Sequence, residues 1–152
     1  MEKHSDIQFL PHLIIDFLNV KKTIEGQLIG GNLAILTSML GSNSQVSMTG
    51  KILFIEEIGE YKYAIDRMLQ SLKRAGYFKN VNAVIVGNIS NIKENSTEWG
   101  SSIEELILAV VPVKIPVLFD FPAGHELDNR ALIFGRNLLL QFGLENCSLV
   151  FK

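Results

Sequence analysis

The chain has 152 residues, a formal net charge of −2 and a hydrophobic fraction of 47%. These values are typical of a single globular domain that buries a core. They offer no broad electrostatic reason to bind nucleic acid or an anionic membrane, and the chain has no run of about 18 apolar residues that would span a bilayer.

The cysteine and histidine content bears on the cellular compartment and on metal binding. Cys147 is the single cysteine, and its apolar neighbours predict a buried thiol in a reducing compartment. The N-terminus lacks the basic segment and apolar run of a secretory signal, so we predict a cytoplasmic protein. His4 and His12 do not have metal-ligand spacing, and we predict neither a metal nor a cofactor.

The first part of the chain combines a segment that is hard to assign with a clearer strand and helix. For residues 1–24 we predict one short strand or helix and no independent domain. Gly30 and Gly31 predict a tight turn between a strand and a helix. Asn32 is placed to cap that helix, and Gly41 to end it.

The middle of the chain alternates buried strands with amphipathic helices. Short apolar runs predict strands at 51–56, 83–87 and 116–119. Periodic apolar residues predict helices at 65–75 and 102–111 between these strands. Such alternation requires crossover connections and therefore predicts an α/β fold with a mainly parallel central sheet.

Two further features complete the predicted fold. Ser101 and Glu104 have the spacing of a capping box, with Glu104 returning to the backbone N–H of Ser101. Residues 130–152 are typical of short strands joined by turns, and they predict a second, more antiparallel β layer.

Candidate chemical groups follow the predicted strands. Glu56 and Glu57 end the first buried strand, and His125 lies six residues beyond the third. Functional groups of open parallel sheets gather past the carboxyl ends of the strands, so we expect Glu56 and His125 to pair. The carboxylate would orient the imidazole and leave its other nitrogen as a general base.

Simpler interpretations compete with this one. A histidine after a glycine is usually an ordinary loop residue, and Glu57 and Glu60 are most simply solvated loop acids. No serine lies in a G-x-S-x-G elbow, and Cys147 has no base near it in sequence. The sequence therefore predicts a general base without a nucleophile.

Four segments carry a resemblance in a fixed order. They are Leu28–Leu36 with Gly41, Ile52–Glu60 with Asp66–Leu69, Val84–Gly87, and Pro116–Leu118 with Gly124–His125. From about residue 25 to 140 they resemble the C-terminal domain of the LD-carboxypeptidase family, including its microcin-immunity branch. Each segment is weakly specific alone, but the order of all four is strongly specific.

The resemblance implies a fold and a function. It implies a swivelling β/β/α domain within cytoplasmic serine peptidases that remove the terminal D-alanine of murein tetrapeptides during cell-wall recycling. In that family the C-terminal domain supplies the acid and the histidine of a Ser-Glu-His triad, which are Glu56 and His125 here. The nucleophilic serine and the oxyanion hole belong to an N-terminal domain that we expect to be absent, so this chain alone should be inactive.

Departures from the family and alternative functions remain. Glu57 stands where the family often has Asp, and Phe134-Gly135 replaces a common Pro-Leu-Gly ending. The alternatives are an immunity-type peptidase acting on peptide-nucleotide antibiotics, a non-catalytic interaction module, and a small-molecule site at Gly30-Gly31-Asn32. The resemblance also implies a homodimer.

Overall fold

The computed structural model describes residues 7–9, 22–93, 96–97, 100–142 and 147–152. The strands are β1 (Ile7–Phe9), β2 (Lys22–Asn32), β3 (Ile52–Ile58), β4 (Ala83–Ser90), β5 (Val117–Leu118), β6 (Asn137–Phe142) and β7 (Cys147–Phe151). The helices are α1 (Leu33–Ser38), α2 (Lys62–Arg74) and α3 (Ile103–Val110). Most of the predicted lead-in segment 1–24, including His4 and His12, lies outside the described residues.

The described strands form one seven-stranded sheet in the order β1-β7-β6-β2-β3-β4-β5. The strands β2 to β5 are parallel, as predicted, whereas β1, β7 and β6 are antiparallel to their neighbours. The long strand β2 belongs to both parts, because Lys22–Gln27 pairs with β6 and Leu28–Asn32 pairs with β3. The sheet therefore changes from antiparallel to parallel pairing within a single strand.

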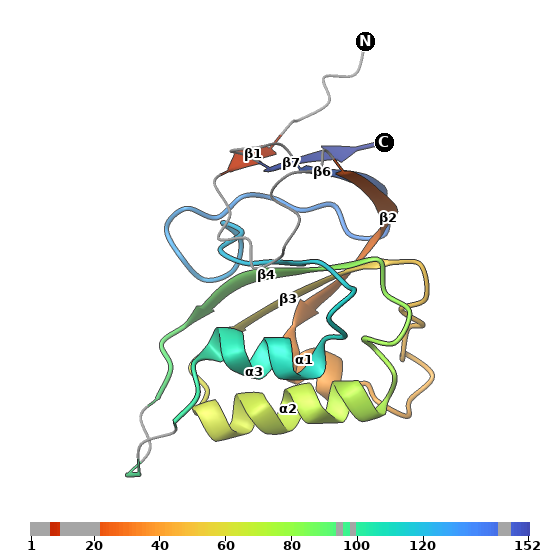
Figure 1. The fold of residues 1–152 in the computed structure, drawn as a ribbon. Coiled ribbons are helices and arrows are strands. Elements are labelled where there is room, and N and C mark those ends of the chain that lie inside the picture. The colour runs from red at the N-terminus through yellow and green to blue at the C-terminus, as the bar shows by residue number, and fades with distance from the viewer. Residues whose placement is uncertain (1–6, 10–21, 94–95, 98–99, 143–146) are drawn as a thin grey trace.

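Figure 1 shows the antiparallel strands, the parallel strands and the helices as three successive layers. The second, antiparallel β layer predicted from residues 130–152 is formed by β6 and β7 together with β1 and the first half of β2. The β/β/α arrangement is thus confirmed. It leaves the parallel strands covered on both faces, which explains their continuous apolar sequences.

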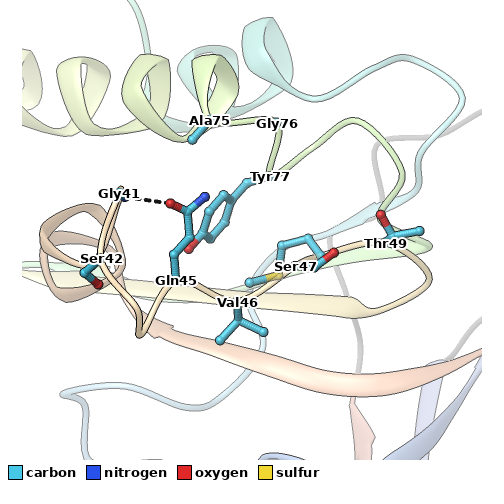
Figure 2. A pocket seen from close by; sticks show the side chains of 10 residues that line it. Gly41, Ser42, Gln45, Val46, Ser47, Thr49, Ala75, Gly76 and Tyr77 are labelled. Atoms are coloured by element: carbon cyan, nitrogen blue, oxygen red, sulfur yellow. Dashed lines mark hydrogen bonds between the residues drawn. The ribbon is translucent and has the colours of Figure 1, made fainter.

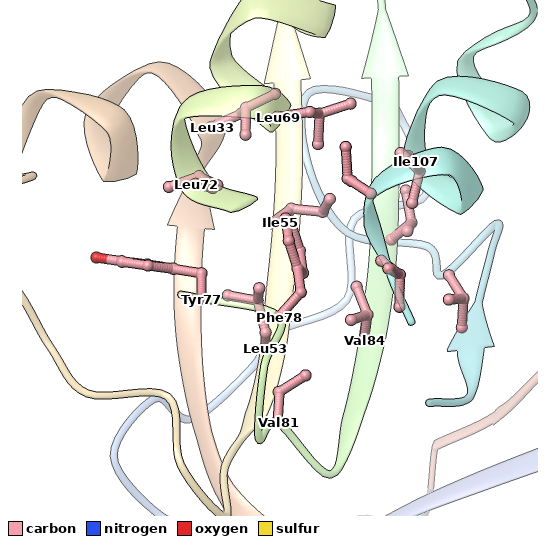
Figure 3. Packing of buried hydrophobic residues seen from close by; sticks show 14 of the residues in the cluster. Leu33, Leu53, Ile55, Leu69, Leu72, Tyr77, Phe78, Val81, Val84 and Ile107 are labelled. Atoms are coloured by element: carbon pink, nitrogen blue, oxygen red, sulfur yellow. The ribbon is translucent and has the colours of Figure 1, made fainter. Parts of the chain in front are cut away.

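Two hydrophobic cores lie on opposite faces of the parallel strands. Leu53 and Ile55 of β3 face the helices, where they join residues such as Leu69 and Ile107 (Figure 3). Their neighbour Phe54 faces the antiparallel layer and packs in the second core. Successive side chains of a strand point to opposite faces, so one strand contributes to both cores.

The predicted helix faces agree with the structure. Ile65, Met68, Leu69 and Leu72 are buried on α2. After the C-cap residue Ala75 comes Gly76, whose φ is +81°, and the N–H of Tyr77 donates to the carbonyl of Leu72. This pattern is a Schellman ending, which a left-handed glycine permits.

The capping box of α3 is one residue further along than predicted. Ser102, and not Ser101, is the N-cap residue, and its hydroxyl accepts from the backbone N–H of Glu105. The Glu105 carboxylate accepts in return from the N–H of Ser102. Consecutive serines followed by consecutive glutamates fit the same spacing twice, so only the backbone geometry distinguishes the two pairs.

The predicted tight turn at Gly30 and Gly31 is wrong. Both glycines lie inside β2, which continues to Asn32 and passes directly into α1. Their φ angles are +146° and +143°, and a Cβ on Gly30 would lie 1.9 Å from the carbonyl oxygen of Phe54. Gly30 therefore lets β2 and β3 approach closely, whereas a Cβ on Gly31 would meet no atom within 4 Å.

Candidate active site

Glu56 lies at the carboxyl end of β3, where the ladder with β4 is irregular. Ile55 pairs with Val86 and Glu57 pairs with Ile89, so two residues of β4 stand opposite Glu56 alone. This is a β-bulge, a feature that re-aims side chains and is common beside functional sites. The Glu56 side chain is 10% exposed. The carboxylate is therefore largely shielded from water, although it lies at the end of the strand.

The segment that carries His125 is held against the end of β4 by backbone hydrogen bonds. The N–H of Phe121 donates to the carbonyl of Val86 at 3.0 Å, and the N–H of Asn88 donates to the carbonyl of Ala123 at 2.9 Å. The N–H of Arg130 donates to the carbonyl of Pro122 at 2.7 Å. These bonds bring residues distant in sequence to the carboxyl edge of the parallel strands.

Two glycines allow this close approach. A Cβ on Gly87 would lie 2.3 Å from the carbonyl oxygen of Ala123. A Cβ on Gly124, whose φ is +140°, would lie 3.1 Å from the Cβ of Asn88. Any larger residue at Gly87 would push the histidine segment away from β4.

Glu56 and His125 meet at this edge, although 69 residues separate them in sequence. The Nδ1 atom of His125 lies 2.9 Å from Oε2 of Glu56. With the carboxylate ionised and the imidazole neutral, Nδ1–H donates to Glu56 and the Nε2 atom carries the lone pair. The imidazole is 49% exposed, and no described residue forms a hydrogen bond with Nε2. The predicted pairing in space is therefore present.

Glu57 differs from its prediction as a solvated loop acid. It belongs to β3 and is only 3% exposed, and its side chain lies on the α1 side of the strand. Its carboxylate accepts from the side-chain amide of Asn32 and from the N–H groups of Ala34 and Ile58. The sequence offered no signal for this burial except the strand that continues to Ile58. Glu60, by contrast, is half-exposed.

Asn88 is a second residue of the site that the sequence did not indicate. It lies on the bulged segment of β4, and its side chain packs against the Gly124 backbone, on the side where a Cβ would point. Its Oδ1 atom is buried and has no hydrogen-bond partner within the described part of the chain. Its place beside the histidine segment could be found only from the strand pairing.

A pocket of about 490 Å³ lies away from the pair (Figure 2). It is lined by residues 41–42, 45–49 and 75–77, from the loops that lead into β3 and β4, and so lies at the amino edge of these strands. The Gln45 side chain accepts from the N–H of Gly41 within it. Serines line this pocket, but no carboxylate or imidazole does, so no serine there has an activating base.

Cys147 is not a candidate nucleophile. It is buried in the core between the two β layers, as predicted. Burial raises the pKa of its thiol to about 12, so the thiol stays protonated near neutral pH. Among the described residues, no group of three or more His, Cys, Asp or Glu side chains is placed to hold a metal ion. No helix in the same residues is long and apolar enough to cross a membrane.

These features define a three-layered α/β domain that presents a carboxylate–imidazole pair at the carboxyl edge of its parallel strands. The model of the LD-carboxypeptidase C-terminal domain family matches residues 25–140. The chain belongs to this family.

Individual relatives agree with the family match. The chain is 38% identical over 112 residues to a probable murein peptide carboxypeptidase of Bacillus subtilis, a match that covers 73% of this chain and 35% of the relative. The solved muramoyltetrapeptide carboxypeptidase of Oxalobacter formigenes superposes with a TM-score of 0.81 at 27% identity, covering 99% of this chain and 50% of that protein. The chain thus spans about a third to a half of the relatives it matches.

The immunity branch is also similar. The microcin C7 self-immunity protein MccF of Escherichia coli is 32% identical over 127 residues, covering 83% of this chain and 37% of MccF. A structure of MccF in complex with aspartyl sulfamoyl adenosine superposes with a TM-score of 0.75 at 29% identity, covering 88% of this chain and 40% of that protein.

Proposed function

We propose that this chain supplies the acid and the base of a Ser-Glu-His triad in a serine LD-carboxypeptidase, a hydrolase that cleaves the amide before the terminal D-amino acid of murein tetrapeptides. Glu56 is the acid and His125 is the base. The observation that carries the proposal is the 2.9 Å contact between Nδ1 of His125 and the Glu56 carboxylate. Family membership and the murein peptide relative support the substrate class.

The mechanism follows from this geometry. Glu56 holds the imidazole with Nδ1 protonated, so the Nε2 atom accepts the proton of a serine hydroxyl as that oxygen attacks the amide carbon. The same proton then passes to the departing amine of the D-amino acid as the C–N bond breaks. Water hydrolyses the resulting acyl-serine by the same proton path. Glu56 stabilises the imidazolium formed in each half of the cycle.

In this proposal the attacking serine and the oxyanion hole come from an N-terminal domain of the relatives' kind, and residues 25–152 act as the C-terminal domain. Supporting this, the exposed apolar residues Leu127, Ile133 and Phe134 follow His125 in the chain. Exposed apolar side chains suit a docking surface. By itself the chain should not hydrolyse the peptide, because the attacking atom and the oxyanion donors are elsewhere.

Localisation and assembly complete the proposal. A free, buried thiol at Cys147 suits the reducing cytoplasm, where murein fragments are recycled. We also propose a homodimer, as the family resemblance implies.

The test is a chimaera in which this chain follows the N-terminal domain of the Bacillus subtilis relative. It should release D-alanine from a murein tetrapeptide, and Glu56→Gln or His125→Ala should lower kcat/KM by about 10³-fold or more. Glu126→Gln is the matched control, because Glu126 is an exposed acid beside His125. Full activity in either site variant would contradict the assignment.

The similarity to MccF supports a second candidate, an immunity-type peptidase acting on a peptide-nucleotide. The same chimaera is therefore also offered aspartyl sulfamoyl adenosine, the molecule in the MccF structure. Preferential hydrolysis of that compound would favour this candidate, with the same two residues as acid and base. A folded chimaera that hydrolyses neither substrate would favour a non-catalytic interaction module.

A further inference from the structure

Glu57 is anchored more firmly than the acid beside it. Its Oε1 atom accepts from Nδ2 of Asn32 at 2.8 Å and from the N–H of Ile58 at 2.9 Å, and its Oε2 atom accepts from the N–H of Ala34 at 2.8 Å. Asn32 ends β2 and Ala34 lies in the first turn of α1. The carboxylate thus ties the end of β3 to the junction of two other elements.

The direction of Glu57 determines the direction of Glu56. Adjacent side chains of a strand point to opposite faces, so a Glu57 side chain held on the α1 side places Glu56 on the His125 side. A slip of one residue would exchange the two carboxylates.

The ladder with β4 does not by itself prevent such a slip at this point. Glu56 lies opposite the bulge and has no paired residue on β4, and regular pairing resumes only at Glu57 with Ile89. Bulged segments bend and twist more than regular strands do. On the other side of β3 the β2 ladder pairs Glu56 with Asn32 and ends there. Beyond Glu56, the hydrogen bonds from Asn32 and Ala34 to the Glu57 carboxylate therefore continue the connection of β3 to β2 and α1, and they hold the pleat where the β2 ladder stops.

We propose that Glu57 is a positioning residue, whose buried carboxylate holds the end of β3 so that Glu56, and not Glu57, faces His125. The inference rests on the proposed role of the Glu56–His125 pair. It assigns Glu57 no contact with substrate.

The experiment measures the tautomer of His125 in the 152-residue chain by the ¹⁵N chemical shifts of its imidazole nitrogens at a pH where the imidazole is neutral. In the unmodified chain the shifts should report Nδ1–H, as the bond to Glu56 requires. Glu57→Gln replaces a two-sided acceptor by an amide that accepts on one side only. The variant should lose the Nδ1–H preference and shift toward the mixture seen for a solvent-exposed histidine.

Glu105→Gln is the matched control, because it removes an acid that caps a different helix start, that of α3. It should leave the His125 shifts unchanged. Asn32→Ala is a second variant, which removes one of the three donors to Glu57 together with the side-chain cap of α1, and it should cause a smaller shift in the same direction. It carries the test if Glu57→Gln does not fold.

The outcomes separate the two proposals. Nδ1–H in the unmodified chain, lost in Glu57→Gln and kept in Glu105→Gln, supports the positioning role. Unchanged His125 shifts in folded Glu57→Gln, or in Asn32→Ala where that variant carries the test, overturn it. Absence of Nδ1–H in the unmodified chain would contradict the proposed function itself.

Discussion

Several single residues of this chain have roles that depend on the space around them. Gly30 and Gly31 are adjacent, identical and similar in φ, yet only Gly30 faces the backbone of β3. Likewise, Glu56 and Glu57 are adjacent acids with different partners. At this scale, local contacts and not residue type determine the effect of a substitution.

The two glycines offer a prediction with an internal control. Gly31→Ala should destabilise the fold by about 1–3 kcal/mol, the usual cost of a strained backbone conformation. Gly30→Ala should cost clearly more, because its Cβ would also lie 1.9 Å from the carbonyl oxygen of Phe54. Urea denaturation of the three chains measures both free energies of unfolding. Equal losses would contradict the close approach of β2 and β3.

At the scale of elements, helix ends are specified by hydrogen bonds that the sequence places only within a residue or two. α2 ends with a left-handed glycine at Gly76, as its pattern predicts. It begins at Lys62, three residues before the predicted start, and Tyr61 at its N-cap makes no side-chain cap. Ser101 and Ser102 both precede α3, and only the structure shows which of them caps it.

The cap of α3 can be tested by comparing these two serines. Ser102→Ala removes the hydroxyl that accepts from Glu105 and should destabilise the fold by about 1 kcal/mol. Ser101→Ala should change the free energy of unfolding by less than about 0.5 kcal/mol. The side chain of Ser101 has no hydrogen-bond partner among the described residues, and the Lys62 ammonium donates to its backbone carbonyl, which the substitution keeps. Thermal or urea unfolding checks both values. A larger loss in Ser101→Ala would restore the cap predicted from the sequence.

At the scale of the whole molecule, one sheet separates two cores. The helices cover one face of the parallel strands, and the antiparallel layer covers the other. The Glu56–His125 pair lies where β3 and the segment after β5 meet at one edge. Cys147 lies in the core between the β layers, so its titration is linked to the stability of the whole molecule.

Cys147 predicts a loss of stability at alkaline pH. Burial raises the pKa of its thiol from 9.0 to about 12 in the folded chain. Below pH 9 the thiol is protonated in both the folded and the unfolded states, so its contribution to stability is fully present. Above pH 9 the unfolded state releases the proton first, and the free energy of unfolding should fall with a slope that rises toward about 1.4 kcal/mol per pH unit.

Cys147→Ala should reduce this slope between pH 9 and pH 10, where the thiol contributes more than the buried phenol of Tyr77, whose pKa is also raised by burial. The free energy of unfolding by urea, measured at several pH values, checks the slope in both chains. Identical slopes would show that another group is responsible. At neutral pH the variant should be somewhat less stable, because it loses buried volume.

Local sequence patterns were sufficient to predict most of the helices and strands of the parallel half and the faces that they bury. The apolar spacing of Ile65, Met68, Leu69 and Leu72 and the continuous run at 83–86 are local periodic patterns, and secondary structure follows local periodicity. The rule for strand ends, together with the family resemblance, also brought Glu56 and His125 to the same edge. These predictions required no knowledge of how distant segments pair.

The bulge opposite Glu56, the burial of Glu57 and the position of Gly30 within a strand could not be predicted from local patterns. Each of these depends on the register between β3 and its neighbours, and a shift of one residue reverses the face of every side chain. Register is set by packing and hydrogen bonds between distant segments, so no local pattern carries it. The 2.9 Å separation of Glu56 and His125 is for the same reason a property of the fold and not of the sequence pattern.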